Sequence, residues 1–265
     1  MWFVSRTLIL AYLMILFKPD VTDGNLILFM GRNYEDSFPD CDVHLFFQEF
    51  YVDFHNKPCY DEAEIRFPSE LTSASDKRQT EFLAGRSAAK RALEFLGQPP
   101  ADILISENRS PLWPKNIMVS LSYNNSVAVC AVSQSPACRF LGVDIEETMS
   151  DDITSKISSS VVGGREKEIL DSLSMSANLA LTIAFSAKES LFKALSFKVG
   201  RLFGFEDVLI SSFSIRDNSI TFELLNHIVK KAKLQRKLRC LFRIGKDFVI
   251  TLVADTQVAL NHRWL

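Results

Sequence analysis

The sequence predicts an α+β protein with two comparable halves, one around residues 76–132 and one around residues 141–253. Each half combines a long helical pattern with apolar stretches of strand length. No internal sequence repeat relates the two halves. We therefore expect an N-terminal extension at residues 1–29, an N-terminal half at 30–140 and a C-terminal half at 141–265.

Composition limits the classes of function. The chain has 265 residues, of which 47% are hydrophobic and 23% charged, as in ordinary globular proteins with a sizeable core. A net charge of −2 gives no overall case for nucleic-acid binding. The five cysteines have no C-x-x-C spacing, which argues against a disulfide scaffold or a zinc site and fits a reducing compartment.

Residues 1–17 are apolar with one arginine. This is shorter than the ~20 residues that a membrane-spanning helix needs, and no small-residue cleavage site follows. Three interpretations stay open: a membrane-associating segment, a first helix or strand of the fold, or translated sequence upstream of a true start at Met14 or Met30.

The N-terminal half contains a strand region, a helix and a hairpin. Residues 42–54 are aromatic and β-branched and predict one or two strands. Residues 76–96 predict a long helix that ends at a glycine and a proline pair. Residues 103–107 predict a strand, 108–114 a turn, and 118–132 a hairpin.

The predicted helix at 76–96 carries a basic row. Arg86 and Lys90 are four residues apart on one face, and Arg78 lies two turns earlier. Such a row is usually a solvated helix surface. The alternative is an anion-binding face, because guanidinium groups suit phosphate oxygens.

The C-terminal half opens with a strand at 141–147 whose alternation places Asp144 and Glu146 on one side. Residues 182–195 predict a helix on which Glu189 and Lys193 lie four apart. If the helix packs on the strand, three carboxylates converge and need a cation between them, for which magnesium is suited. The alternative is a solvated strand end beside a surface ion pair.

The rest of this half is less distinctive. Residues 148–164 are serine-rich and predict a surface loop, and residues 165–173 predict a short amphipathic helix with Glu166 and Glu168 at the surface. Further strands are expected at three places: residues 208–213, 219–224 and 248–253. Residues 230–243 form a basic run, which is either a solvated face or a docking surface for an acidic partner.

Five segments in this order resemble the 4'-phosphopantetheinyl transferase superfamily: residues 77–93, 111–114, 120–132, 141–147 and 184–194. The resemblance is closest to the siderophore-synthetase branch, the enterobactin synthetase component D type. Its most specific motifs are G-V-D-I-E and F-S-A-K-E-S-L-F-K-A. It implies two similar α/β halves in one chain, a pseudo-dimer, with coenzyme A at their junction.

The resemblance also implies a reaction and roles for the carboxylates. The enzyme would transfer 4'-phosphopantetheine from coenzyme A to a serine of an apo aryl, peptidyl or acyl carrier protein domain. Asp144, Glu146 and Glu189 would hold Mg2+ on the coenzyme A pyrophosphate. Glu189 could also take the serine proton, and Lys193 would stabilise phosphate charge or tune Glu189.

Coenzyme A contacts are carried over position by position. Arg86 matches the arginine of the family's A-G-R motif and Arg78 a basic position upstream, both near the 3'-phosphate and adenosine. Arg109 is the expected substitute for a lysine of the family's G-K-P segment. Ser122 matches the S-x-S-H motif, but Tyr123 stands where the family has histidine. Because a tyrosine hydroxyl carries no positive charge, coenzyme A affinity should fall by ~1–3 kcal/mol unless another group compensates.

The resemblance implies a cytoplasmic monomer, because an exported protein would lose access to coenzyme A. It favours a natural start near Met30, while membrane association through residues 1–17 stays open. No nucleic-acid partner is expected. The alternative function, suggested by Tyr123, is a coenzyme A-binding homologue with reduced or no transfer activity in a synthetase complex.

Overall fold

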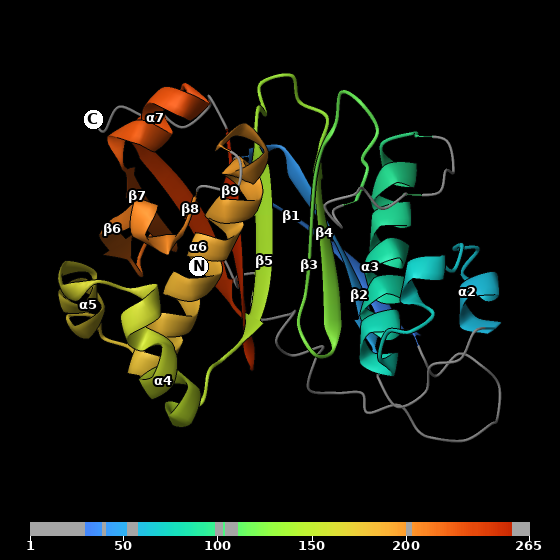
Figure 1. Ribbon diagram of the computed structural model, residues 1–265, viewed down its shortest axis with the longest axis horizontal. Helices are drawn as coiled ribbons and strands as arrows, with labels where there is room; N and C mark the ends of the chain where they lie inside the picture. The colour runs from blue at the N-terminus through green and yellow to red at the C-terminus, as the bar shows by residue number, and fades with distance from the viewer. Residues whose placement is uncertain are drawn as a thin grey trace, which may run out of the picture.

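The computed structural model describes residues 30–38, 41–51, 58–98, 103, 111–199 and 203–255. It contains two antiparallel sheets, one from each half of the sequence (Figure 1). This confirms the predicted α+β class. The N-terminal sheet has the order β1-β2-β4-β3, formed by β1 (Met30–Phe38), β2 (Val43–Phe50), β3 (Met118–Tyr123) and β4 (Val127–Ser133). Its helices are α2 (Pro58–Glu62) and α3 (Asp76–Phe95).

The C-terminal sheet has the order β5-β9-β8-β7-β6. Its strands are β5 (Leu141–Glu147), β6 (Val208–Ser214), β7 (Ser219–Leu224), β8 (Lys237–Ile244) and β9 (Phe248–Ala254). The helices of this half are α4 (Asp151–Val161), α5 (Gly164–Asp171), α6 (Ala177–Val199) and α7 (Asn226–Ala232). Two short 3-10 helices, Ser69–Leu71 and Phe205–Asp207, complete the regular structure of the described residues.

The two sheets pack against each other, and α3 and α6 cover their outer faces (Figure 1). Alternation along each strand divides its side chains between these layers. On β5, the residues that enter the core between the sheets are Leu141, Val143 and Ile145. The alternate residues, Gly142, Asp144 and Glu146, are therefore on the face covered by α6, as the sequence predicted.

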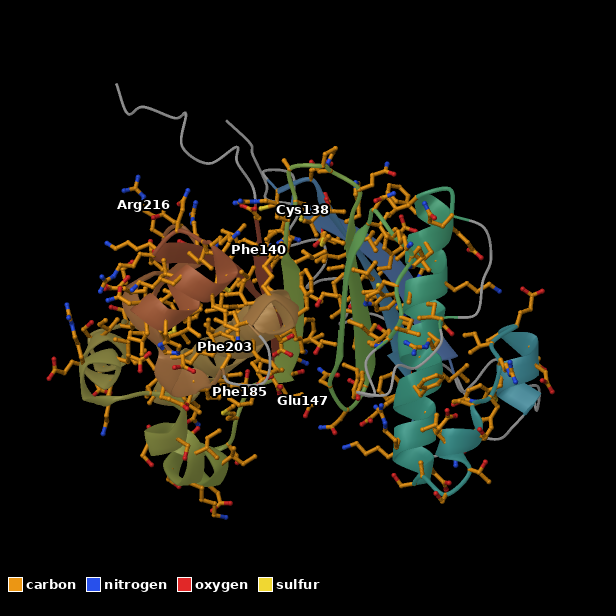
Figure 2. The ribbon with its side chains drawn as sticks, turned by 45° about the horizontal axis from the view of Figure 1, so that its top comes forward. Cys138, Phe140, Glu147, Phe185, Phe203 and Arg216 are labelled. Carbon is orange, nitrogen blue, oxygen red and sulfur yellow. The ribbon has the colours of Figure 1, made fainter. Side chains whose placement is uncertain are left out.

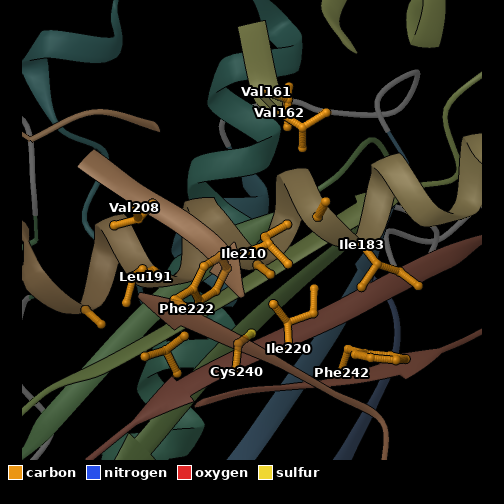
Figure 3. Packing of buried hydrophobic residues seen from close by; sticks show 14 of the residues in the cluster. Val161, Val162, Ile183, Leu191, Val208, Ile210, Ile220, Phe222, Cys240 and Phe242 are labelled. Atoms are coloured by element: carbon orange, nitrogen blue, oxygen red, sulfur yellow. The ribbon is translucent and has the colours of Figure 1, made fainter. Parts of the chain in front are cut away.

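Helix α6 is held against its sheet by a large apolar core. Figure 3 shows Ile183 and Leu191 of α6 packed with Ile210, Phe222 and other side chains of β6, β7 and β8. All of these side chains are almost fully buried. At about 1.5–3 kcal/mol for each large apolar side chain buried, this packing fixes where the polar face of α6 lies.

The halves are also joined by polar contacts. The Ser120 hydroxyl on β3 accepts a 3.0 Å hydrogen bond from the Val143 amide on β5. Arg243 of β8 pairs with the Asp36 carboxylate of β1, and it donates a 2.6 Å hydrogen bond to the Ser37 carbonyl. Its guanidinium carbon lies 4.2 Å from the Phe38 ring centre. Arg243 is thus part of the contact between halves and not of a purely solvated basic face.

Most of the predicted elements are confirmed within three residues at each end: α3, the β3–β4 hairpin, β5, α5, β6, β7 and β9. The helix predicted at 182–195 is confirmed as α6, which is five residues longer at its start and four at its end. All five cysteines are buried, and none of them forms a disulfide within the described residues. The described residues contain no helix long and apolar enough to cross a bilayer. Residues 1–17 and 104–110, for which predictions were made above, lie outside the described residues.

The predicted loop at residues 148–164 was wrong, because it contains helix α4. The Ser150 side chain caps this helix by accepting a 3.4 Å hydrogen bond from the Ile153 amide. Asp151 and Asp152 lie in its first turn, where they complement the helix dipole. Ser150, Asp151 and Asp152 are a helix start signal in the sequence, but the serine-rich composition of the segment led to the prediction of a loop. Strands β1 and β8 were not predicted. For β8 the reason is that residues 230–243 were interpreted by their positive charge and not by their strand pattern.

Candidate active site

The site begins with the close contact of α6 and β5. A Cβ atom added to Gly142 would lie 1.9 Å from the Ser190 carbonyl oxygen and 2.6 Å from the Ala194 amide nitrogen. Only glycine allows the helix backbone to approach this closely. The contact brings the polar side chains of α6 to those of β5, which is the packing that the sequence-based hypothesis required.

Asp144 lies where the two halves of the chain meet. Its side chain is only 2% exposed. Its Oδ1 atom accepts a 2.8 Å hydrogen bond from Ser122 Oγ on β3 and a 2.6 Å bond from Lys193 Nζ on α6. Lys193 Nζ also donates to Ser122 Oγ at 2.7 Å. The structure therefore brings together three predicted site residues from β3, β5 and α6.

The second oxygen of Asp144 has a partner that the sequence analysis missed. Its Oδ2 atom accepts a 2.8 Å hydrogen bond from Ser186 Oγ on α6. An ionised carboxylate has about four acceptor positions. Within the described part of the chain, three are taken, and the fourth is on Oδ2. Asp144 can thus keep all these contacts and still bind a cation.

Glu146 and Glu189 share an electrostatic environment with Asp144. Burial and the negative charge of Asp144 raise the pKa of Glu146 to about 7, while Lys193 opposes the shift. Burial and Asp144 also raise the pKa of Glu189, again against Lys193. Each carboxylate is therefore harder to ionise because of burial and its acidic neighbours, and a bound cation would relieve this cost.

The oxygen-only donor set of Asp144, Glu146 and Glu189 suits magnesium, and their mutual repulsion fits a cation between them. In the arrangement described, no three histidine, cysteine, aspartate or glutamate side chains of the described residues stand close enough together to enclose a metal ion. Magnesium usually keeps several waters and shares its ligands with phosphate oxygens, so it needs no closed protein cage.

Arg78 and Tyr123 form a pair on the wall of the N-terminal half. The Arg78 guanidinium donates a hydrogen bond to the Tyr123 hydroxyl, and its central carbon lies 5.5 Å from the centre of the tyrosine ring. Arg78 also lies 3.6 Å from the Glu81 carboxylate. Arg78 therefore places a positive charge beside the Tyr123 hydroxyl.

Arg86 and Lys90, two residues of the basic row on α3, have different surroundings. Arg86 is only 5% exposed and its guanidinium carbon lies 4.5 Å from the Phe82 ring centre. Burial lowers its pKa to about 10, and its buried Nε atom has no hydrogen-bond partner among the described residues. A buried guanidinium of this kind fits an anion better than a solvated surface. Lys90 instead pairs with Glu64 at 2.6 Å, an ordinary surface contact.

Contacts at the carboxyl end of β5 also bridge the halves. Glu147, labelled at this end in Figure 2, accepts a 2.9 Å hydrogen bond from the Asn125 side chain of the β3–β4 turn. Asn125 in turn accepts a 2.7 Å bond from Lys77 at the start of α3. All three side chains are solvent-exposed, so they form a rim around the more buried Asp144.

Three other predicted positions are placed differently. Arg109 lies outside the described residues. Glu166 was expected at the surface but is 3% exposed, and it pairs with buried Lys188 at 2.8 Å. Lys188 also donates to the Val161 carbonyl at 2.7 Å, so this ion pair fixes α6 against α4 and α5. The basic residues of α7 lie at the end of the molecule away from the carboxyl end of β5 (Figure 1).

Two family models match this chain. The family model for the 4'-phosphopantetheinyl transferase N-terminal domain matches residues 67–133. The family model for the 4'-phosphopantetheinyl transferase superfamily matches residues 140–253. The chain belongs to the 4'-phosphopantetheinyl transferase superfamily, and its class is that of a transferase.

Curated relatives indicate the branch within the family. Enterobactin synthase component D of Salmonella typhimurium is 37% identical over 184 residues, which are 69% of this chain and 75% of the relative. The protein of the same name from Salmonella typhi is 40% identical over 54% of this chain and 59% of its own length. A 4'-phosphopantetheinyl transferase of Nocardia iowensis is 30% identical over 56% of this chain and 65% of the relative. The siderophore type predicted from the motifs agrees with these relatives.

Proposed function

We propose that this protein transfers 4'-phosphopantetheine from coenzyme A to the serine hydroxyl of an apo carrier domain of a siderophore synthetase, and that the reaction depends on magnesium. The observation that carries this proposal is the meeting of Ser122, Asp144 and Lys193 where β3, β5 and α6 converge. In the reaction, a bond forms between the serine oxygen and the phosphorus next to the pantetheine. The bond from that phosphorus to the bridging oxygen breaks, which releases 3',5'-ADP.

Asp144, Glu146 and Glu189 would hold the magnesium ion. When bound, magnesium would neutralise negative charge on the pyrophosphate and on the leaving group. The raised pKa values of Glu146 and Glu189 support this assignment, because they arise from burial and from the neighbouring carboxylate of Asp144. Magnesium dependence of the wild-type reaction tests this part of the proposal.

The side chains of this protein would carry out the remaining steps. Glu189 would accept the proton of the carrier serine. The ammonium group of Lys193, shared between Asp144 and Ser122, would lie beside the transferred phosphate. Arg78, Arg86 and Arg109 would contact the nucleotide end of coenzyme A.

A second candidate function is coenzyme A binding without transfer, because Tyr123 replaces a histidine of the family motif. The contact between Tyr123 and Arg78 weakens this reason for the second candidate. The arginine contributes a charge that tyrosine lacks, so the loss of histidine is compensated from α3. On this basis we expect coenzyme A affinity to be retained.

The protein would act as a monomer, because the two halves of one chain already provide both sides of the site. It would act in the cytoplasm, where it has access to coenzyme A. Membrane association through residues 1–17 is a separate possibility. Fractionation of the full chain against one that starts at Met30 tests it. A tether predicts that only the full chain sediments with membranes, and equal solubility of the two would remove it.

The test of function is the intact mass of a carrier. The protein is incubated with coenzyme A, Mg2+ and an apo aryl, peptidyl or acyl carrier domain in turn. We expect a gain of one phosphopantetheine, fastest on the aryl and peptidyl carriers and absent with EDTA. No gain on any carrier, with coenzyme A binding still detected by calorimetry, would favour the second candidate.

A further inference from the structure

A chain of buried hydroxyl groups leads away from Asp144 to a strand that the reaction does not use. Ser186 Oγ, which contacts Asp144 Oδ2, lies 2.9 Å from Thr251 Oγ1 on β9. Thr251 Oγ1 lies 2.7 Å from Ser190 Oγ, one turn further along α6. All three hydroxyl-bearing side chains are fully buried. Their hydrogen bonds are therefore shielded from water and strongly coupled.

The proton order along this chain follows from its acidic end. The Asp144 carboxylate, paired with Lys193, can only accept, so Ser186 must donate its single hydroxyl proton to it. Ser186 then accepts from Thr251, and Thr251 accepts from Ser190. Ser190 shares its proton between the hydroxyl and the carbonyl oxygen of Thr251, the latter at 2.9 Å. Ser186 and Thr251 therefore donate in the direction of Asp144, whereas Ser190 also donates to the Thr251 carbonyl.

The fold explains why Thr251 occupies this position. Thr251 stands directly opposite Asp144 in the β5–β9 register. It is the one polar residue in the strand sequence F-V-I-T-L-V-A. An isolated buried hydroxyl in an apolar strand has an energetic cost unless it is hydrogen-bonded, and here Ser186 and Ser190 of α6 are among its side-chain partners, together with Cys240 of β8.

We propose that Thr251 is a positioning residue for the metal site: acting through Ser186, its hydroxyl fixes how the Asp144 carboxylate is turned and thus which acceptor position a metal ion meets. The inference rests on the proposed function, because it assigns magnesium to Asp144. Thr251 itself would contact neither substrate nor metal. Its effect is on the metal affinity of a ligand two hydrogen bonds away.

The test is Mn2+ binding, measured by electron paramagnetic resonance with coenzyme A present and no carrier, so that no turnover occurs. Because groups that orient metal ligands typically change affinity by 10- to 100-fold, we expect a loss of about that size for Ser186→Ala and of about 3- to 10-fold for Thr251→Val. Thr251→Ser should restore binding to within about twofold of wild type, since it keeps the hydroxyl. The double variant Ser186→Ala/Thr251→Val should bind no more weakly than Ser186→Ala alone.

A matched control is Thr80→Val on α3. The Thr80 hydroxyl is also fully buried, but it donates to the Asp76 carbonyl of its own helix at 2.8 Å. Its loss should leave Mn2+ affinity unchanged. If Thr251→Val does not fold, Thr251→Ala removes the same hydroxyl without adding bulk and is expected to lose affinity similarly.

Two failures can be told apart. Wild-type affinity in Thr251→Val and Thr251→Ala, or losses that add in the double variant, would overturn the positioning role alone. Absence of Mn2+ binding by the wild-type protein would overturn the metal site of the proposed function, and this inference with it.

Discussion

The packing of α6 on β5 predicts that Gly142→Ala is damaging. The added Cβ would lie 1.9 Å from the Ser190 carbonyl oxygen, and ordinary contact begins at 3.4 Å. The helix must therefore withdraw by about 1.5 Å, the difference between these distances, because its backbone cannot rotate aside as a side chain could.

Two consequences can be estimated. Overpacking a well-filled core costs ~1–3 kcal/mol, and a clash with backbone belongs at the upper end, about 3 kcal/mol. The withdrawal also moves Lys193 and Glu189 away from Asp144. Since misplacement of reacting groups by about 1 Å can cost about 100-fold in rate, transfer should fall by about that factor.

Urea unfolding measures the first effect, and the initial rate of carrier modification measures the second. The control is Gly164→Ala at the start of α5, where an added Cβ meets no atom within 4 Å. That variant should be at least as stable as wild type and equally active. If Gly142→Ala kept wild-type stability and a rate within twofold, the close packing of α6 on β5 described above would be refuted.

Three further predictions follow from the same contacts. Glu189→Gln should abolish transfer and leave coenzyme A binding by calorimetry largely intact; unchanged transfer would end its role as base. Lys188→Met should destabilise the fold by ~3–5 kcal/mol in urea unfolding, because it leaves the buried Glu166 carboxylate uncompensated, whereas Lys188→Met/Glu166→Gln should recover part of the loss, since glutamine is neutral and keeps an acceptor for the Ile210 amide. Since the pKa of Glu146 is raised to about 7 and metal binding needs its ionised form, Mg2+ affinity should fall about fivefold from pH 7 to pH 6. A flat profile over this range would exclude Glu146 as a ligand.

The same raised pKa sets the sign of a stability effect. The folded protein holds the Glu146 proton up to about pH 7, whereas an unfolded glutamate releases it near its ordinary value. The contribution of this group to stability is therefore present at acidic pH and lost as the pH rises through about 7. Added Mg2+ should restore stability above pH 7, which thermal unfolding with and without the metal would measure.

The candidate site could be predicted where strand periodicity controls it. Alternation along β5 placed Asp144 and Glu146 on the face opposite Val143, and the spacing on α6 placed Glu189 beside Lys193. Both placements could be predicted because each depends on the periodicity of one element only. The resemblance to the family then favoured the hypothesis of a metal site over that of a solvated strand end.

The partners of Asp144 that come from other elements could not be read in this way. Thr251 lies 107 residues after Asp144, and only the β5–β9 register makes them neighbours. The hydrophobic pattern of a strand predicts which of its side chains face the core, but not which residues of a distant strand lie opposite them. Burial was misjudged for the same reason: Glu166 looked like a surface residue of a short helix, but it accepts from the Ile210 amide at 2.9 Å and pairs with Lys188.

We have proposed that Asp144, at the junction of the two halves, holds the metal used for phosphopantetheine transfer. This role is tested most directly by the intact mass of an apo aryl carrier after incubation with coenzyme A and either wild type or Asp144→Ala. We expect a gain of one phosphopantetheine with wild type and Mg2+, and no gain with EDTA or with Asp144→Ala. Equal modification by Asp144→Ala, or by wild type in EDTA, would contradict it.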